Sequence, residues 1–149
     1  MKKALGNKNC FICGQESEIG LRVKFEMNEK GAWAVHTPRP EFEGFGGVIH
    51  GGILCSLLDE VMWKTINGLT GAVTMTAKLD VRFKKPADVG ESLTIQGEIL
   101  AEKTKSKQKF FEAKSTITNS DGKVLAEATG RYIEPADETR AAGLAESLS

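Results

Sequence analysis

One stretch of the chain determines the fold class: GGILCSLLDEVMWKTIN, residues 51–67. Its apolar residues recur at helical spacing and cover a very wide arc of the helix surface. A helix that is apolar over so wide an arc is buried in a core rather than laid on a surface. The glycine-containing residues 68–71 end the pattern. The sequence therefore predicts a buried helix over residues 51–67.

Segments that alternate apolar and polar residues lie on both sides of this helix, and such alternation is typical of strands with one buried face. It occurs over residues 21–27, 73–84, 93–99 and 111–117, and residues 32–37 and 124–133 are expected to add two further strands. Residues 119–122, Asn-Ser-Asp-Gly, are a strong hairpin signal. Short hairpin-type connections between the four later strands require an antiparallel sheet. We expect an α+β fold in which an antiparallel sheet of about six strands wraps around one long central helix.

The 149 residues are expected to form one domain over residues 1–134. Residues 1–19 are expected to be a loop segment packed on it. After Pro135 the composition turns to Ala, Glu and small polar residues, which predicts a tail or a short surface helix over residues 135–149. Residues 38–47 are too rich in Gly and Pro for a regular element, and functional groups tend to lie in such loops.

Charge and hydropathy restrict the classes of partner. The chain has 20 acidic and 20 basic side chains, so it lacks the basic excess that nucleic-acid binding requires. No stretch approaches the roughly 18 apolar residues needed to span a bilayer. Residues 1–9 are basic, but no apolar stretch of a signal peptide follows them. We expect a cytoplasmic protein that binds neither nucleic acid nor membrane.

Three cysteines fit this location. Cys10 and Cys13 have the spacing of half a zinc site. The remaining ligand candidates are Cys55, His36 and His50, which form no second close pair. We therefore expect no metal, and interpret the first two cysteines as small thiols in a packed N-terminal loop.

Glycines surround the start of the predicted helix, in GGVIHGG, residues 46–52. The first amide N–H groups of a helix have no partner within the helix, and they lie at the positive end of its dipole. They attract a developing negative oxygen, such as that of a thioester carbonyl under nucleophilic attack. The alternative is that the glycines only let the backbone pass close to a neighbouring strand.

Asp59 is an ionisable residue in this apolar helix, where burial is costly without a partner or a task. Ser56 and Trp63 share its face, so they would form a polar notch beside an aromatic wall. A carboxylate there could attack a thioester or activate water. Alternatively, Asp59 reaches solvent or pairs with a lysine. Glu60 precedes Lys64 by four residues and is expected to pair with it.

The separation of Gly51 and Asp59 predicts a shared site. Eight residues span about 12 Å of straight helix, whereas oxyanion donors and a nucleophile should lie within roughly 3 Å of the same reacting group. Two helices lying antiparallel across a two-fold axis can each pair a glycine end with the partner's carboxylate. We therefore expect a homodimer with its sites between subunits.

Residues 47–60, GVIHGGILCSLLDE, resemble the His-Gly-Gly, then Asp, signature of hotdog-fold acyl-CoA thioesterases. The similarity is to the phenylacetyl-CoA thioesterase-like branch, which residues 42–47 and 75–86 also resemble. The Cys-Phe-Ile-Cys-Gly run of residues 10–14, followed by Gly20-Leu21, adds to it. The resemblance covers roughly residues 10–133 and implies a hotdog fold, sheets joined edge to edge in a homodimer, and a dimer of dimers.

The resemblance also implies roles for individual residues. Asp59 corresponds to the catalytic carboxylate, Gly51 to the oxyanion N–H donor, and His50 to the residue that holds the loop. Thr76 matches a supporting hydroxyl, although strand alternation alone places it on the polar face. Relatives carry an asparagine that orients water where this chain has Gly44.

The expected substrate is an acyl-CoA or aryl-CoA thioester, hydrolysed to the free acid and coenzyme A. No metal and no cofactor is expected, apart from coenzyme A as part of the substrate. Basic side chains, Arg82 and Lys84 among them, could hold its phosphates. The substrate-binding residues are expected to be Gly52, Gly44, Phe45, Ser56, Trp63, Met75, Arg82 and Lys84.

Two other functions stay open. One is a non-catalytic acyl-CoA binding or sensing protein on the same fold, which the glycine at position 44 favours. The other is a dehydratase or hydratase, for which the chain lacks the His/carboxylate pattern.

Overall fold

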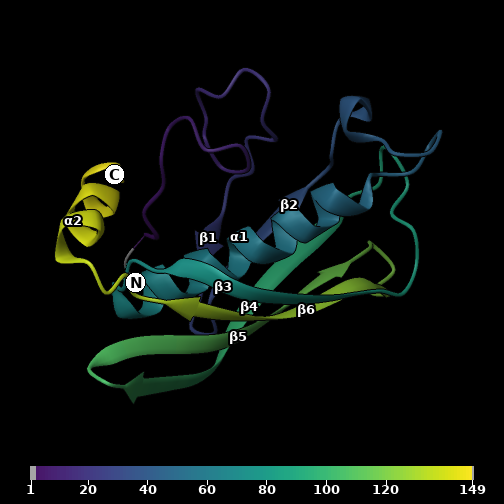
Figure 1. The fold of residues 1–149 in the computed structure, drawn as a ribbon. Helices are drawn as coiled ribbons and strands as arrows, with labels where there is room; N and C mark the ends of the chain where they lie inside the picture. Colours follow the sequence, from purple (N-terminus) through teal and green to yellow (C-terminus); the bar gives the residue numbers. More distant parts are fainter. Residues whose placement is uncertain (1–2, 149) are drawn as a thin grey trace.

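Six strands form one antiparallel sheet, and one long helix, α1 (Gly51–Thr70), lies across a face of it (Figure 1). The computed structural model describes residues 3–148. The strands pair in the order β1-β2-β4-β5-β6-β3. This confirms the predicted α+β fold with about six strands around one central helix. The strands are β1 (Glu26–Met27), β2 (Ala32–His36), β3 (Met75–Phe83), β4 (Leu93–Lys105), β5 (Gln108–Thr118) and β6 (Val124–Ile133).

The apolar arc of α1 explains its position on the sheet. Its fully buried side chains, which pack in one core with those of the sheet, are Leu57, Leu58, Val61, Met62 and Ile66. The helix runs three residues beyond the predicted end. It stops where Gly71 adopts a left-handed φ of 77° and donates its N–H to Asn67 O at 2.8 Å.

A glycine lets α1 lie directly on the middle of the sheet. A Cβ at Gly97 of β4 would lie 2.4 Å from Thr65 Oγ1 and 2.7 Å from Val61 O, closer than any side chain allows. The Thr65 hydroxyl in turn accepts a hydrogen bond from the backbone N–H of Ala32 in β2 at 2.9 Å. The helix axis is therefore held close to both β2 and β4.

β3 and β4 follow one another in sequence but do not pair, so the predicted hairpin-type connection between them is wrong. β3 pairs with β6, whereas β4 pairs with β2 and β5. The connection, residues 84–92, passes over the N-terminal end of α1. There Ala87 O accepts a hydrogen bond from Ile49 N at 2.9 Å. This crossing brings basic residues of the connection to the start of the helix.

The predicted strand over residues 21–27 is too long. Only β1 is a strand, because Arg22 adopts a φ of 55° that interrupts the extended chain. Leu21 and Val23 are still buried, as their alternation predicts, but their N–H groups bond to Phe11 O and Ile12 O. The N-terminal segment, rather than a strand, is their partner.

β3 is an edge strand. Its nine residues pair with β6 on one side, and no other strand within residues 3–148 pairs with its other side. Phe83, at the end of β3, remains 55% exposed. A long strand with an unpaired edge is a template for pairing with another chain.

The segment after Pro135 contains a second helix, α2 (Glu138–Glu146), none of whose described residues is buried. Asp137 caps it by accepting hydrogen bonds from the N–H groups of Thr139 and Arg140. Residues 1, 2 and 149 of the predicted domain and tail lie outside the described part of the chain. Within residues 3–148, no helix combines the length and hydropathy that crossing a bilayer requires.

Candidate active site

Among the described residues, the N-terminal end of α1 presents one amide without a hydrogen-bond partner. His50 is the N-cap, and its Nδ1 accepts a hydrogen bond from Gly52 N at 2.8 Å. The backbone N–H of His50 donates to Phe42 O at 2.9 Å, so the residue also anchors the preceding loop. Within residues 3–148, the N–H of Gly51 has no hydrogen-bond acceptor. It is the donor that this end of the helix leaves free.

A cavity of about 590 Å³ opens at this end of the helix. It includes five of the predicted site residues: Gly44, Phe45, His50, Gly51 and Lys84. Its other lining residues are Val48, Ile49, Leu54, Phe83, Lys85, Pro86 and Ala87. The crossing connection thus adds two lysines to a mostly apolar hollow next to the free amide.

Two hydroxyl groups orient the carboxylate of Asp59. Thr76 Oγ1 donates to Asp59 Oδ1 at 2.8 Å, and the Tyr132 hydroxyl donates to the same oxygen at 2.7 Å. In the described part of the chain, Asp59 forms no ion pair with a lysine, and no donor binds its Oδ2. One carboxylate oxygen is therefore held while the other is available.

A β-bulge brings Thr76 to this position. Thr76 pairs with Tyr132 of β6, but Lys78 pairs with Arg131, so Ala77 is an extra residue in β3. The extra residue reverses the alternation of the strand. Thr76 consequently shares the helix-facing side with Tyr132, and its placement on the polar face by simple alternation is wrong.

Gly51 and Asp59 do not meet within one chain. They are eight residues apart on a straight stretch of α1, about 12 Å, and Asp59 does not line the cavity at the helix start. The described part of one chain thus presents a free amide and an oriented carboxylate at two separate places.

Comparison with known proteins identifies the family of this chain. Residues 46–126 match the model of the Thioesterase superfamily. The chain belongs to this family. It is 27% identical over 136 residues, 89% of this chain, to the bovine acyl-coenzyme A thioesterase THEM4, and 33% identical over 120 residues to a candidate esterase of Saccharolobus solfataricus. The latter match covers 75% of this chain and 78% of the archaeal protein.

A solved structure of a hypothetical thioesterase protein from Streptococcus pneumoniae, with coenzyme A, has a TM-score of 0.66 and 20% identity. The match covers 74% of this chain and 84% of that one. The chain spans about half the length of the mammalian curated relatives that it matches. The predicted superfamily and hotdog fold are confirmed.

Tyr132, whose hydroxyl contacts Asp59, is a residue of the candidate site that the sequence interpretation missed. It is the single tyrosine of the chain, fully buried in a strand of otherwise small or apolar inward side chains. Burial and the neighbouring Asp59 carboxylate raise the pKa of its hydroxyl well above the usual value, so it remains a proton donor. The sequence did contain a signal for this role, because a tyrosine stands among the apolar, inward-facing positions of this strand and a buried tyrosine hydroxyl needs a hydrogen-bond partner.

The other predicted substrate-binding residues lie elsewhere. The N–H of Gly52 is taken by His50, and the Ser56 hydroxyl donates back to Gly52 O at 2.9 Å. Trp63 Nε1 donates to Thr74 O at 2.7 Å and ties α1 to the chain just before β3. Arg82 lines a separate hollow of about 310 Å³, away from the cavity at the helix start. Met75, at the first position of β3, is partly buried and pairs with Ile133.

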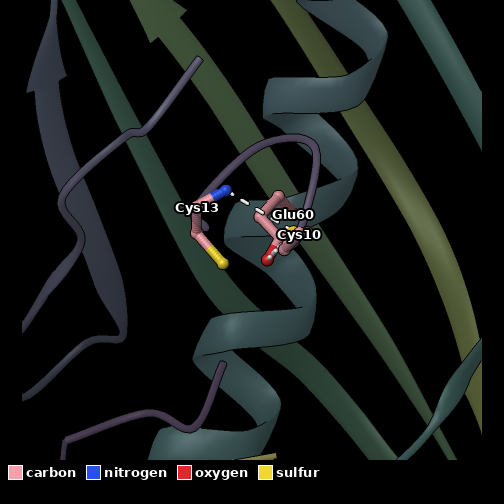
Figure 2. A group of neighbouring side chains, drawn as sticks. All are labelled: Cys10, Cys13 and Glu60. Carbon is pink, nitrogen blue, oxygen red and sulfur yellow. Dashed lines mark hydrogen bonds between the residues drawn. The ribbon is translucent and has the colours of Figure 1, made fainter. Parts of the chain in front are cut away.

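The expected pairing of Glu60 with Lys64 is wrong. Among the described residues the two form no ion pair, and Lys64 instead donates to the backbone oxygen of Leu5. Glu60 lies beside Cys10 and Cys13 (Figure 2). A hydrogen bond from Cys13 lowers the pKa of the Cys10 thiol to about 5, and burial raises the pKa of the Glu60 carboxyl to about 7.

Proposed function

We propose that the chain hydrolyses an acyl-CoA or aryl-CoA thioester to the free acid and coenzyme A. The observation that carries this proposal is the free Gly51 N–H beside the cavity, on the same helix as the carboxylate that two hydroxyls orient. The names of the curated relatives, acyl-coenzyme A thioesterases THEM4 and THEM5, support the reaction class.

The Gly51 amide would stabilise the oxyanion. Attack on the thioester carbonyl places a negative charge on its oxygen, and the amide lies where the helix dipole is positive. His50 accepts a hydrogen bond from the next amide and so fixes the backbone, and the Gly51 N–H would meet the oxyanion without reorganisation of the loop. The tetrahedral intermediate then collapses, the carbon–sulfur bond breaks and the thiolate of coenzyme A leaves.

Asp59 would supply the attacking group. Either its free oxygen attacks the carbonyl carbon, or it takes a proton from a water that attacks. Both routes consume one water and release one acid and one thiol. The two hydroxyl donors hold Oδ1, so the free Oδ2 keeps one direction relative to the helix.

A homodimer would complete the site. The unpaired edge of β3 can join that of a second copy, and two α1 helices would then lie antiparallel. The partner's Asp59 could in this way reach the free Gly51 amide. The exposed Phe83, which lines the cavity and lies beside Gly51, would be covered at this seam. A dimer of dimers and a cytoplasmic location stay predictions.

The cavity suits a thioester of coenzyme A. Its apolar walls include Phe45 and Phe83 for the acyl or aryl group, and Lys84 and Lys85 could bind phosphates. Lys84 also forms an ion pair with Glu127 at 3.3 Å, so it would exchange that partner on binding. We propose no metal in the hydrolytic centre.

Non-catalytic binding of acyl-CoA is the second candidate function. A Cβ at Gly44 would lie 3.2 Å from His50 Cα, so a water-orienting asparagine would require the loop to shift. A protein without that side chain could bind the thioester and leave it intact.

The substitution Gly51→Pro tests the oxyanion donor. Proline lacks the N–H but fits the first position of a helix, and the φ of −58° and ψ of 135° at His50 suit a residue before proline. We expect kcat for hydrolysis of acyl-CoAs to fall by about 10²–10³-fold. Release of free coenzyme A is followed with a thiol reagent.

Gly51→Ala is the matched control, because it keeps the N–H and its Cβ would meet Phe83 only at 3.6 Å. We expect it to retain most of the activity, with circular dichroism confirming that both variants fold. Equal rates for the two variants would contradict the assigned donor. A wild-type protein that binds a panel of acyl-CoAs without cleaving any of them would establish the binding alternative.

Tyr132→Phe removes one hydroxyl and keeps the ring in the core. Because a hydrogen bond to a charged group is worth about 1.5–3 kcal/mol, we expect kcat to fall by about 10–100-fold while KM changes little. Steady-state kinetics on one acyl-CoA provides both parameters. Thr76→Ala should act in the same direction, and an unchanged kcat in both variants would show that the two donors do not position the carboxylate.

A further inference from the structure

A second cluster of reactive side chains lies away from the proposed active site, where the N-terminal segment crosses α1 (Figure 2). Cys10 and Cys13 belong to a tight turn that Gly14 N closes by donating to Cys10 O at 2.9 Å. The N–H groups of Ile12 and Cys13 both point at Cys10 Sγ, at 3.4 and 3.5 Å. Two amide donors on one sulfur stabilise a thiolate, which is the form that binds a metal.

Glu60 adds a third ligand from a different part of the chain. Its Oε1 lies 3.8 Å from Cys10 Sγ. The two sulfurs and one carboxylate oxygen all lie within 4.8 Å of one another. Ligand atoms around a tetrahedral zinc ion are separated by about 3.3–3.8 Å, given its bond lengths to sulfur and oxygen. Cys10 Sγ and Glu60 Oε1 already have this spacing, and the other pairs would need to close by at most about 1 Å.

Charge and access also suit a divalent cation. Two thiolates and one carboxylate carry three negative charges, which a divalent ion and the buried Lys64 would balance. Lys64 and Cys13 both line a cavity of about 850 Å³. A metal ion can reach the sulfur from this cavity, and water there can occupy a fourth coordination position.

We propose that Cys10, Cys13 and Glu60 bind one zinc ion. The thiolate pair selects zinc over magnesium or calcium. The ion ties the N-terminal segment to α1 at the residue after Asp59, so the site supports the helix that carries the proposed active-site carboxylate. A disulfide between the two cysteines would use both thiols and leave the Glu60 carboxylate without a cation.

This metal site departs from the sequence interpretation, which expected no metal. That interpretation sought the missing ligands among cysteine and histidine residues only. Glu60 is 50 residues from Cys10, and no local spacing connects them. The proposal does not depend on thioester hydrolysis, since the three ligands lie outside the cavity at the Gly51 amide.

Metal binding to the reduced, chelator-stripped full chain tests the proposal. We expect one equivalent of Zn²⁺ to bind in competition with a chromogenic chelator. Co²⁺ should produce thiolate-to-cobalt charge-transfer absorption with the visible bands of a tetrahedral site. At about 100 times the Kd, zinc should raise Tm by about 5–10 °C.

Single substitutions distinguish the proposed ligands from other residues of the chain. Cys10→Ser and Cys13→Ser should weaken zinc binding by at least about 100-fold, and Glu60→Gln by about 10–100-fold. Cys55→Ser is the matched control, because this third cysteine is also partly buried but lies on α1 outside the cluster. It should bind zinc like the wild type.

Three results would overturn the zinc site. The first is a cobalt spectrum of the wild type without thiolate charge transfer, which needs no variant to fold. The second is zinc affinity that survives Cys10→Ser and Cys13→Ser. The third is a freshly purified, folded chain whose thiol titration shows Cys10 and Cys13 already joined and which binds no zinc after reduction.

Discussion

Replacing Asp59 with asparagine is expected to lower kcat for thioester hydrolysis by about 10³-fold. The amide keeps the shape of the carboxylate and an oxygen that can accept hydrogen bonds from Thr76 and Tyr132. It removes the negative charge that attacks the carbonyl or takes the proton of water. Steady-state kinetics with an acyl-CoA measures the loss, and thermal unfolding should show a Tm close to that of the wild type.

Asp80→Asn is the matched control, because Asp80 is an exposed carboxylate on the same strand as Thr76 and pairs with Thr129. Its kcat should stay within about two-fold of the wild type. Asp59→Asn protein that hydrolyses thioesters at more than a tenth of the wild-type rate would remove Asp59 from the reaction.

Mixing two inactive variants is expected to restore activity. A 1:1 mixture of Asp59→Asn and Gly51→Pro chains, denatured and refolded together, should recover about a quarter of the wild-type rate. About half of the dimers are then mixed, and each mixed dimer has one site with both the intact amide and the intact carboxylate. The rate rises from about 1% or less to this level only if the two groups come from different subunits.

The control is the same mixture combined without denaturation, which should remain inactive until subunits exchange. Refolding each variant alone should restore no activity. Failure of the co-refolded mixture, when size-exclusion chromatography shows dimers, would place the amide and the carboxylate of each site in one chain. A protein that stays monomeric at assay concentration and is active would exclude the shared site altogether.

Local periodicity was sufficient to predict the helix and the sheet class. The apolar arc of residues 51–67 forms α1, and the alternating segments form β2 to β6, because burial of one face dictates where apolar side chains recur. The same reasoning singled out Asp59 as the polar exception and Gly51 as the first helical amide. Both groups belong to one continuous helix, so the local sequence is enough to locate them.

Local sequence patterns could not predict the pairings between distant segments. The alternation of residues 73–84 placed Thr76 on the wrong face, because the extra residue at Ala77 is defined only by the register with β6. Tyr132 reaches Asp59 across 73 residues, and Glu60 meets Cys10 across 50. The spacing of residues within one segment does not indicate a contact with a distant segment.

The amino-acid order alone determined the buried helix, the strand-rich architecture and the two chemical groups that α1 carries. Periodicity reports which side of an element is buried, and that is a local quantity. The three-dimensional packing selected the strand order, the bulge, the hydroxyl pair on Asp59 and the Cys10, Cys13 and Glu60 cluster. These features depend on which surfaces of the helix and strands pack together. The free energy of that packing comes from contacts across the whole core, most of them between residues far apart in the sequence.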